Sequence, residues 1–221
     1  YAVYPLTNTV GGADFVQNLN RKVYSTIESL FNNKGLKRED YIDYYSADTL
    51  HLTIAEYNGD HNFLLQLPVP QKAVELGERA VSGASPFTVS FEGIAPAGDA
   101  LVATAYVESP ILTEIRDGFN RLTPEYALDA SQLPRRKNIV HATIGRFRQV
   151  PPQEIIEALK KLASRKIDLG TITVDQIRLV SQVGQHIAST PLTVHQTYPL
   201  QIQRGARLAE ARQAWPKART A

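Results

Sequence analysis

The chain has 221 residues, 43% of them hydrophobic and 21% charged, which is typical of a soluble globular protein of one large domain or two small lobes. Its formal net charge of +2 does not indicate a protein that coats nucleic acid, and the absence of cysteine excludes disulfides, thiolate metal sites and thiol nucleophiles. No apolar run approaches the roughly 18 residues needed to span a bilayer, so we expect no membrane partner.

The first half of the chain predicts alternating strands and helices. Apolar residues recur at spacings of three and four from Phe15 to Leu30, behind the helix cap Asp14, and indicate an amphipathic helix. The predicted elements are a strand at 1–6, a helix at 14–33, a strand at 50–57, a helix at 70–81 and hairpin strands at 87–91 and 101–107.

The second half repeats much of this order. Ser109 followed by Pro110 is a typical helix start, and Pro151–Pro152 begins another helix. The predicted elements are a helix from 109, a polar loop at 123–137, a strand at 139–147, a helix from 151, strands at 172–183 and 192–201, and a basic tail or short helix at 204–221.

The two halves look like approximate duplicates, because each holds one strand with the pattern His-x-Thr-Ile. No linker composition separates them. We therefore predict a single α+β domain over residues 1–203, with two lobes facing each other across a groove.

The two His-x-Thr strands hold the candidate site. Residues two apart in a strand point to the same face, so His51 shares a face with Thr53, and His141 shares a face with Thr143. If the two strands face one another, the two imidazoles flank a central space. Histidine has an ordinary pKa near 6.5, so at cellular pH one ring can be neutral while the other is protonated, as general acid–base catalysis requires.

The threonine hydroxyls suit the non-bridging oxygens of a phosphate, where they stabilise the charge of a transition state. This set of side chains needs no metal and fits phosphodiester cleavage better than acyl transfer. A lone histidine on a strand is more often a satisfied core or rim residue, but a repeated motif favours function. A metal site is the weaker alternative, because no carboxylate or third histidine has ligand spacing near either motif.

The His-Leu-Thr-Ile and His-Ala-Thr-Ile strands resemble the two His-x-Thr-x (HxTx) signature motifs of the 2H phosphoesterase superfamily. That superfamily includes the bacterial 2′-5′ RNA ligase-like proteins and cyclic nucleotide phosphodiesterases of RNA processing. The resemblance extends from Tyr1 to Gln201. It implies a two-lobed fold with antiparallel sheets lining a central groove and helices outside. It also implies catalytic histidines His51 and His141, phosphate-binding Thr53 and Thr143, and no cofactor.

Further candidates lie close to the second motif. Arg146 resembles the arginine at the end of that strand in relatives, but regular alternation from His141 points it away from the groove. Phe147 falls on the His141 face, where it would stack a base together with Tyr106 or Tyr126. The tyrosines at 41, 44 and 45 are candidates to line the groove. The basic triplet Arg135-Arg136-Lys137 and the basic tail are candidates to attract RNA. The remaining histidines, His61, His186 and His195, are expected at the surface.

The sequence therefore predicts a hydrolase, a metal-independent phosphodiesterase. The resemblance implies 2′,3′-cyclic phosphates, other cyclic phosphates or 2′-5′ bonds of a nucleotide or RNA end as substrates. A non-catalytic nucleotide-binding or RNA-binding module, and a 2′-5′ RNA ligase running the same chemistry in reverse, are the alternatives. We expect a monomer in the cytoplasm. Because the chain starts at Tyr1 and has no methionine, an N-terminal piece is expected to be missing, which leaves an exported mature form open.

Overall fold

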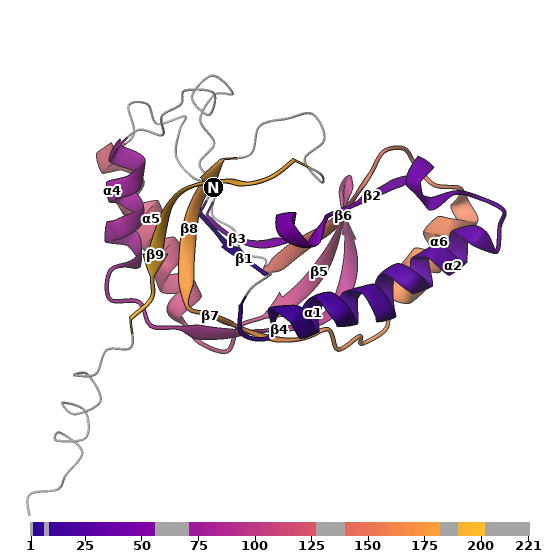
Figure 1. Ribbon diagram of the computed structural model, residues 1–221, viewed down its shortest axis with the longest axis horizontal. Coiled ribbons are helices and arrows are strands. Elements are labelled where there is room, and N and C mark those ends of the chain that lie inside the picture. The colour runs from indigo at the N-terminus through magenta and orange to yellow at the C-terminus, as the bar shows by residue number, and fades with distance from the viewer. Residues whose placement is uncertain (1, 7–8, 56–70, 127–139, 182–189, 202–221) are drawn as a thin grey trace, which may run out of the picture.

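The described strands form one antiparallel sheet that curls into a half-barrel, with the helices around its outside (Figure 1). The structure is a computed structural model and describes residues 2–6, 9–55, 71–126, 140–181 and 190–201. Predictions for His61, His186, the basic triplet at 135–137 and the tail at 204–221 concern residues outside these ranges.

The sheet formed by the described residues has nine strands. Eight of them follow the order β7-β4-β5-β6-β3-β1-β8-β9, and β2 pairs with β6 beside that path. The strands are β1 (Ala2–Pro5), β2 (Ile42–Tyr44), β3 (His51–Ala55), β4 (Phe87–Ala97), β5 (Ala100–Tyr106), β6 (His141–Phe147), β7 (Gly170–Val174), β8 (Gln176–Ser181) and β9 (Thr193–Pro199).

The helices divide between two lobes, and each lobe takes segments from both halves of the chain. The first lobe holds β3, β1, β8 and β9 under α4 (Gln71–Val81) and α5 (Ile111–Tyr126). The second lobe holds β6, β5, β4, β7 and β2, under α6 (Gln153–Ala163) and a long helical run that includes α1 and α2. That run consists of α1 (Gly12–Leu19), a π-helical turn η1 (Asn20–Tyr24) and α2 (Ser25–Asn32).

The buried side of the long helical run explains its π-helical turn. Phe15, Leu19, Val23, Ile27 and Phe31 are each 0% exposed, and they follow one another at intervals of four residues. An α-helix has 3.6 residues per turn, so a strict four-residue spacing drifts around the helix. The wider π turn offsets this drift and keeps all five side chains on the sheet.

The structure confirms the α+β, two-lobed architecture and corrects two details of it. The lobes do not correspond to the two halves of the chain, because α5 covers the first lobe and α1 contacts β7 in the second. Their sheets are also continuous: β3 of the first lobe pairs with β6 of the second at Leu52 and Ala142.

Most predicted elements are confirmed, with local differences. The first helix begins at Gly12 with Gly11 as its N-cap, so the prediction of Asp14 as the cap is wrong, and β4 continues to Ala97, beyond the predicted end at 91. The segment predicted as one strand at 172–183 is two strands, β7 and β8, which separate at Asp175 and lie in different lobes. The helix α5 continues to Tyr126, four residues into the segment predicted as a loop. The short strand β2, within the tyrosine-rich stretch before His51, was not predicted, since three residues are too few for a periodic pattern.

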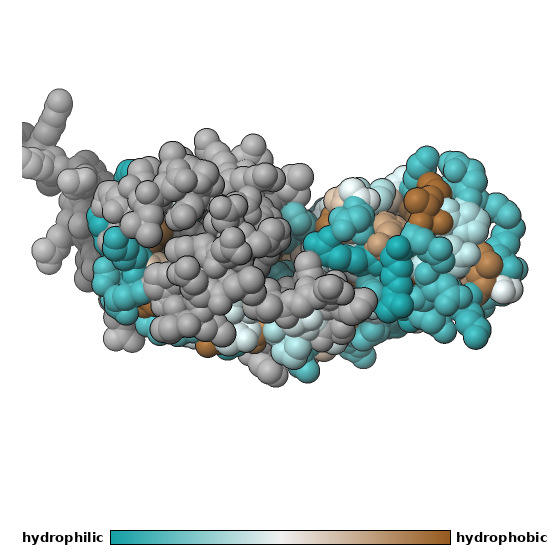
Figure 2. All heavy atoms as spheres, turned by 90° about the horizontal axis from the view of Figure 1, so that it is seen from above, coloured by the Kyte–Doolittle hydropathy of each residue, from teal (hydrophilic) through white to brown (hydrophobic). Residues whose placement is uncertain are grey.

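Within the ranges that the structure describes, no helix has the length and apolar character needed to cross a membrane. Seen from above, the end of the molecule formed by α2 and α6 is mainly hydrophilic, with small separate hydrophobic areas (Figure 2).

Candidate active site

The two His-x-Thr motifs lie on neighbouring strands in antiparallel register. Leu52 of β3 is opposite Ala142 of β6, and both side chains are 0% exposed. One residue to either side, this register sets His51 opposite Thr143 and Thr53 opposite His141. Because alternate residues point to opposite faces, all four polar side chains lie on the face opposite Leu52 and Ala142. We call this face of the sheet, defined by these four residues, the motif face.

The exposure of the four side chains agrees with this placement. All four are partly exposed, whereas the residues between them are buried. Neighbouring strands lie about 4.8 Å apart, so two imidazoles and two hydroxyls are close enough to surround one phosphate group. The structure thus brings together the four residues that the sequence singled out.

Each motif strand contains a β-bulge directly after its threonine. Val3 of β1 pairs with Thr53, but its neighbour Ala2 pairs with Ala55 rather than Ile54. Ile54 is therefore the extra residue in β3. In β5 and β6, Val102 pairs with Thr143 and Leu101 pairs with Gly145, so Ile144 is the extra residue. Both isoleucines are 0% exposed. The two motifs therefore share a local backbone feature as well as a sequence pattern.

The bulge at Ile144 reverses the predicted orientation of the residues that follow it. Ile144 and Gly145 are both buried, and Arg146 pairs with Ala100 and Asp43 on the motif face. Regular alternation predicted Arg146 on the opposite face, and that prediction is wrong because the extra residue shifts the alternation by one.

The same bulge turns Phe147 away from the motif face, toward the core. Phe147 pairs with the buried Ile42 and packs against the hydrophobic core, so its predicted place on the His141 face is also wrong. Tyr106, in contrast, alternates with Thr104, which pairs with His141, and Tyr106 is 61% exposed. Of the two proposed base-stacking residues whose side chains are described, Phe147 and Tyr106, only Tyr106 is on the motif face.

The ring of His51 is held by the backbone of the preceding turn. Its Nδ1 lies 2.8 Å from the carbonyl oxygen of Thr49, a residue of the short helical turn η3 (Ala47–Thr49). A carbonyl only accepts, so Nδ1 carries the proton and, in the neutral ring, Nε2 carries the lone pair. Thr49 is 2% exposed, and its hydroxyl and amide both bond to Ser46. The turn therefore fixes both the tautomer and the direction of the His51 ring.

Tyr45 connects the arginine of the second motif to the histidine of the first. Nε of Arg146 donates to the Tyr45 hydroxyl at 3.4 Å, and the Tyr45 ring meets the His51 ring edge-on, with centroids 6.4 Å apart. Nη1 of Arg146 also forms an ion pair with Asp99 at 2.7 Å. Burial lowers the pKa of Arg146, but the contacts with Tyr45 and Asp99 outweigh it and raise the pKa overall. Arg146 therefore remains a fixed cation beside the two histidines and two threonines of the motif face.

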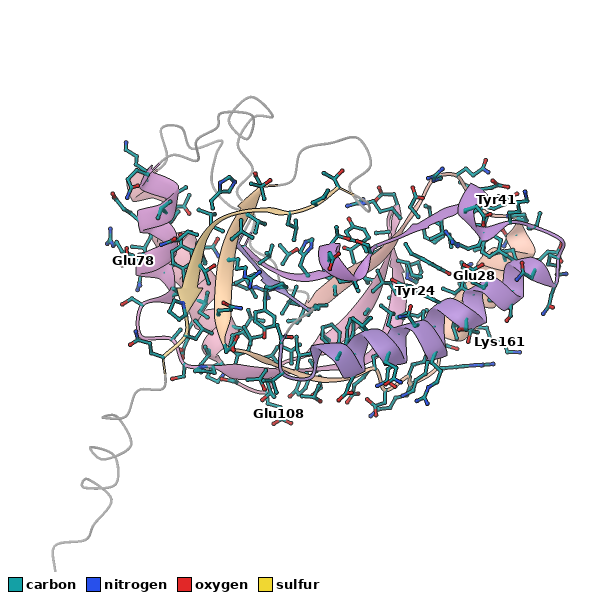
Figure 3. The ribbon with its side chains drawn as sticks, in the orientation of Figure 1. Tyr24, Glu28, Tyr41, Glu78, Glu108 and Lys161 are labelled. Carbon is teal, nitrogen blue, oxygen red and sulfur yellow. The ribbon has the colours of Figure 1, made fainter. Side chains whose placement is uncertain are left out.

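The backbone at each bulge accepts hydrogen bonds from a helical side chain. The Tyr24 hydroxyl, from η1, donates to the carbonyl oxygen of Ile144 at 2.7 Å. In Figure 3, Tyr24 lies between the helix and the strands β2 and β6. In the first lobe, Arg116 of α5 donates from Nε to the carbonyl oxygen of Ile54 at 3.0 Å and from Nη2 to that of Thr53 at 3.3 Å. Arg116 is 7% exposed, and its burial lowers its pKa.

The sequence did not single out these supporting residues. Tyr24 and Arg116 sit on helices far from the motifs in sequence, so no local pattern marks them. The Ser46-to-Thr49 turn is different: hydroxyl residues three apart just before a strand are a turn signal that could have been used. Of the three neighbouring tyrosines, only Tyr45 reaches the site; Tyr44 stacks on Tyr24, with ring centroids 3.9 Å apart, and Tyr41 packs on Phe31.

Two other features bear on the chemistry. In the described part of the chain, no group of three His, Asp or Glu side chains is arranged to hold a metal ion. His195 is partly exposed and its Nε2 lies 2.8 Å from the Ser181 hydroxyl, and burial lowers its pKa.

Comparisons with known proteins identify the family of the chain and a similar fold. A family model described as the 2′-5′ RNA ligase superfamily matches residues 34–186. The fold is similar to TT0787 of Thermus thermophilus, at 16% identity and a TM-score of 0.51, over 80% of this chain and 92% of that chain. A solved structure described as a phosphoesterase is 14% identical, with a TM-score of 0.45 and the same two coverages. No curated protein gives a significant match. At these identities, the likeness to TT0787 concerns the fold alone.

Proposed function

We propose that this chain, which belongs to the 2′-5′ RNA ligase superfamily of 2H phosphoesterases, is a phosphodiesterase with His51 and His141 as its acid–base pair. Its substrates are 2′,3′-cyclic phosphates, other cyclic phosphates or 2′-5′ bonds at a nucleotide or RNA end. The observation that carries this proposal is the register of Leu52 with Ala142, which sets each histidine opposite a threonine of the other motif.

The reaction proceeds by attack of water on the phosphorus atom. One histidine removes a proton from the water as its oxygen forms the new P–O bond. The other histidine donates a proton to the 2′ or 3′ oxygen as the old P–O bond breaks. One histidine thus gains a proton and the other loses one, so the net number of protons on the pair is unchanged. In either role His51 acts through Nε2, because Nδ1 is committed to the Thr49 carbonyl.

Charge builds on the non-bridging oxygens of the phosphate during this step. The hydroxyls of Thr53 and Thr143 are the donors on the motif face that stabilise it. Arg146 adds a positive charge on the same face, held in place by Asp99 and Tyr45. We therefore include Arg146 in the proposed site and leave out Phe147, whose register places it with the core.

The test is product analysis with 2′,3′-cyclic AMP and a 2′-5′-linked adenylate oligomer in the presence of EDTA. We expect the wild type to open at least one substrate, and His51→Ala or His141→Ala to reduce turnover by at least about 100-fold. His195→Ala is the matched control, because His195 pairs with Ser181 and is not one of the four motif residues. We expect this variant to retain activity.

The outcomes separate the alternatives. Wild-type activity in either motif variant contradicts the two-histidine mechanism, and a requirement for added metal contradicts metal independence. Binding without turnover of either substrate supports a non-catalytic binding module. Joining of RNA ends, with no hydrolysis, supports a ligase.

A further inference from the structure

Arg178 of β8 is a cation on the motif face that the proposed reaction does not use. Val3 of β1 pairs with Thr53 on one side and with Arg178 on the other. Paired residues point to the same face, so Arg178 faces the same way as Thr53. His141, Thr53, Val3 and Arg178 thus form one row across four neighbouring strands.

Among the described residues that pair with or flank Arg178 on the motif face, none is acidic. Its neighbours on the motif face are Val3 on β1, Thr197 on β9, and Gln176 and Val180 two residues away along β8. None of these carries a charge. The side-chain Nε of Arg178 is buried and has no hydrogen-bond partner among the described residues.

Four other arginines of the described chain differ from Arg178 in this respect. Each of the four has a carboxylate or carbonyl partner: Arg38 with Glu28, Arg116 with Thr53 and Ile54, Arg146 with Asp99, and Arg148 with Asp43. A buried guanidinium donor without an acceptor is unfavourable, and an incoming anion would satisfy it. Arginine is also suited to phosphate, because its planar fork matches two phosphate oxygens.

The spacing of the strands places this cation beside the reacting phosphate rather than on it. Strands lie about 4.8 Å apart, so the backbone of Arg178 is about 10 Å from that of Thr53 and about 14 Å from that of His141. The reacting phosphate is held between the histidines and threonines. An anion that meets Arg178 is therefore displaced from it along the row, across Val3, toward β8.

We propose that Arg178 binds the phosphate next to the reacting one, so that the preferred substrate is an oligonucleotide end rather than a cyclic mononucleotide. This inference rests on the proposed function and names the substrate class of the same site. Arg178 acts here as a specificity residue, since it recognises a part of the substrate at which no bond is made or broken.

The test compares two substrates with the same terminal nucleoside, 2′,3′-cyclic AMP and a short oligoadenylate that ends in a 2′,3′-cyclic phosphate. For Arg178→Gln, we expect the loss of kcat/KM on the oligonucleotide to exceed the loss on the mononucleotide about tenfold, mainly through KM. Arg121→Gln removes an equal charge from an exposed position on α5 and should affect neither substrate. Equal losses on both substrates, or no loss on either, would overturn the proposal.

A binding experiment keeps this test separate from the proposed reaction. Oligoadenylate with a 3′-phosphate and adenosine 3′-monophosphate are titrated into wild type and Arg178→Gln at several salt concentrations. We expect the variant to bind the oligonucleotide about tenfold more weakly, with a salt slope smaller by about one, and to bind the monophosphate with little change. If the wild type binds but does not react, the proposed function fails on its own. If variant and wild type bind the oligonucleotide equally, the role of Arg178 fails.

Discussion

Tyr24 donates a hydrogen bond from its hydroxyl to the carbonyl oxygen of Ile144, the bulge residue of the second motif, 2.7 Å away. Arg116 makes the equivalent contact with Ile54, the bulge residue of the first motif. Tyr24 lies between β1 and β3 in the chain, and Arg116 lies between β5 and β6. Each motif strand is therefore supported by a helix that precedes the other motif strand in the chain.

The Tyr24 and Tyr44 pair offers a matched test of this support. Tyr24→Phe loses the bond to Ile144, and we expect a decrease of about 1 kcal/mol in the free energy of unfolding. The Tyr44 hydroxyl is buried and has no partner among the described residues, so Tyr44→Phe should leave stability unchanged or raise it by up to about 1 kcal/mol. Urea denaturation at pH 7 measures both. A larger loss for Tyr44→Phe than for Tyr24→Phe contradicts this assignment.

The same two tyrosines make the protein sensitive to alkali. Burial first, and then the charge of Tyr44 on Tyr24 and of Glu28 on Tyr44, raise the pKa of both phenols. A folded-state pKa above the unfolded value of about 10 gives stability that is complete below pH 10 and is lost as the pH rises through the folded pKa. We expect the free energy of unfolding to fall above pH 10, and to fall less steeply in Tyr44→Phe. An identical slope in the variant would show that Tyr44 ionises freely in the folded protein.

Arg116 should be required for the geometry of the first motif. Arg116→Met leaves the carbonyl oxygens of Thr53 and Ile54 without this donor, and we expect a loss of about 2–4 kcal/mol in unfolding free energy together with lower kcat. Arg121→Met, at an exposed position of the same helix, should change stability by less than about 0.5 kcal/mol. Arg116→Lys keeps one donor group and should recover part of both losses. Full activity in Arg116→Met would mean that the bulge holds its shape without this side chain.

The bulge at Ile144 predicts different roles for two nearby arginines. Arg146→Gln removes a cation from the motif face, and we expect kcat/KM to fall about 10–100-fold, as for the loss of a charged hydrogen bond to phosphate. Arg148→Gln breaks an exposed ion pair with Asp43 and should leave both stability and kcat/KM nearly unchanged. Steady-state kinetics with a cyclic phosphate compares them. If Arg148→Gln proves the more damaging variant, the assigned face of Arg146 is wrong.

The junction of the two lobes can be tested with two fully buried leucines. Leu52→Ala and Leu19→Ala each remove a side chain that is 0% exposed, and each should cost about 2–5 kcal/mol. Only Leu52 lies at the β3–β6 pair that aligns the motifs, so only its variant should lose kcat when both proteins are assayed well below their melting temperatures. Leu19 lies in α1, which contacts β7. An equal effect on kcat would mean that the alignment of the motifs does not depend on this pair.

Local patterns in the sequence were sufficient to find the motif residues and the elements that carry them. Strand alternation is a local property with a period of two, so it was enough to place His51 with Thr53 and His141 with Thr143. Helical periodicity likewise located α4 and the long run from Gly12 to Asn32.

The orientation of Arg146 and Phe147 and the composition of the lobes became visible only in the folded chain. A bulge is defined by the partner strand, since the extra residue exists only relative to the residues opposite it, and β5 is remote from Ile144 in sequence. Arg178 joins the motif face for the same reason, through pairings of β8 with β1 and of β1 with β3. Such long-range register depends on the packing of the whole sheet, which no local pattern encodes.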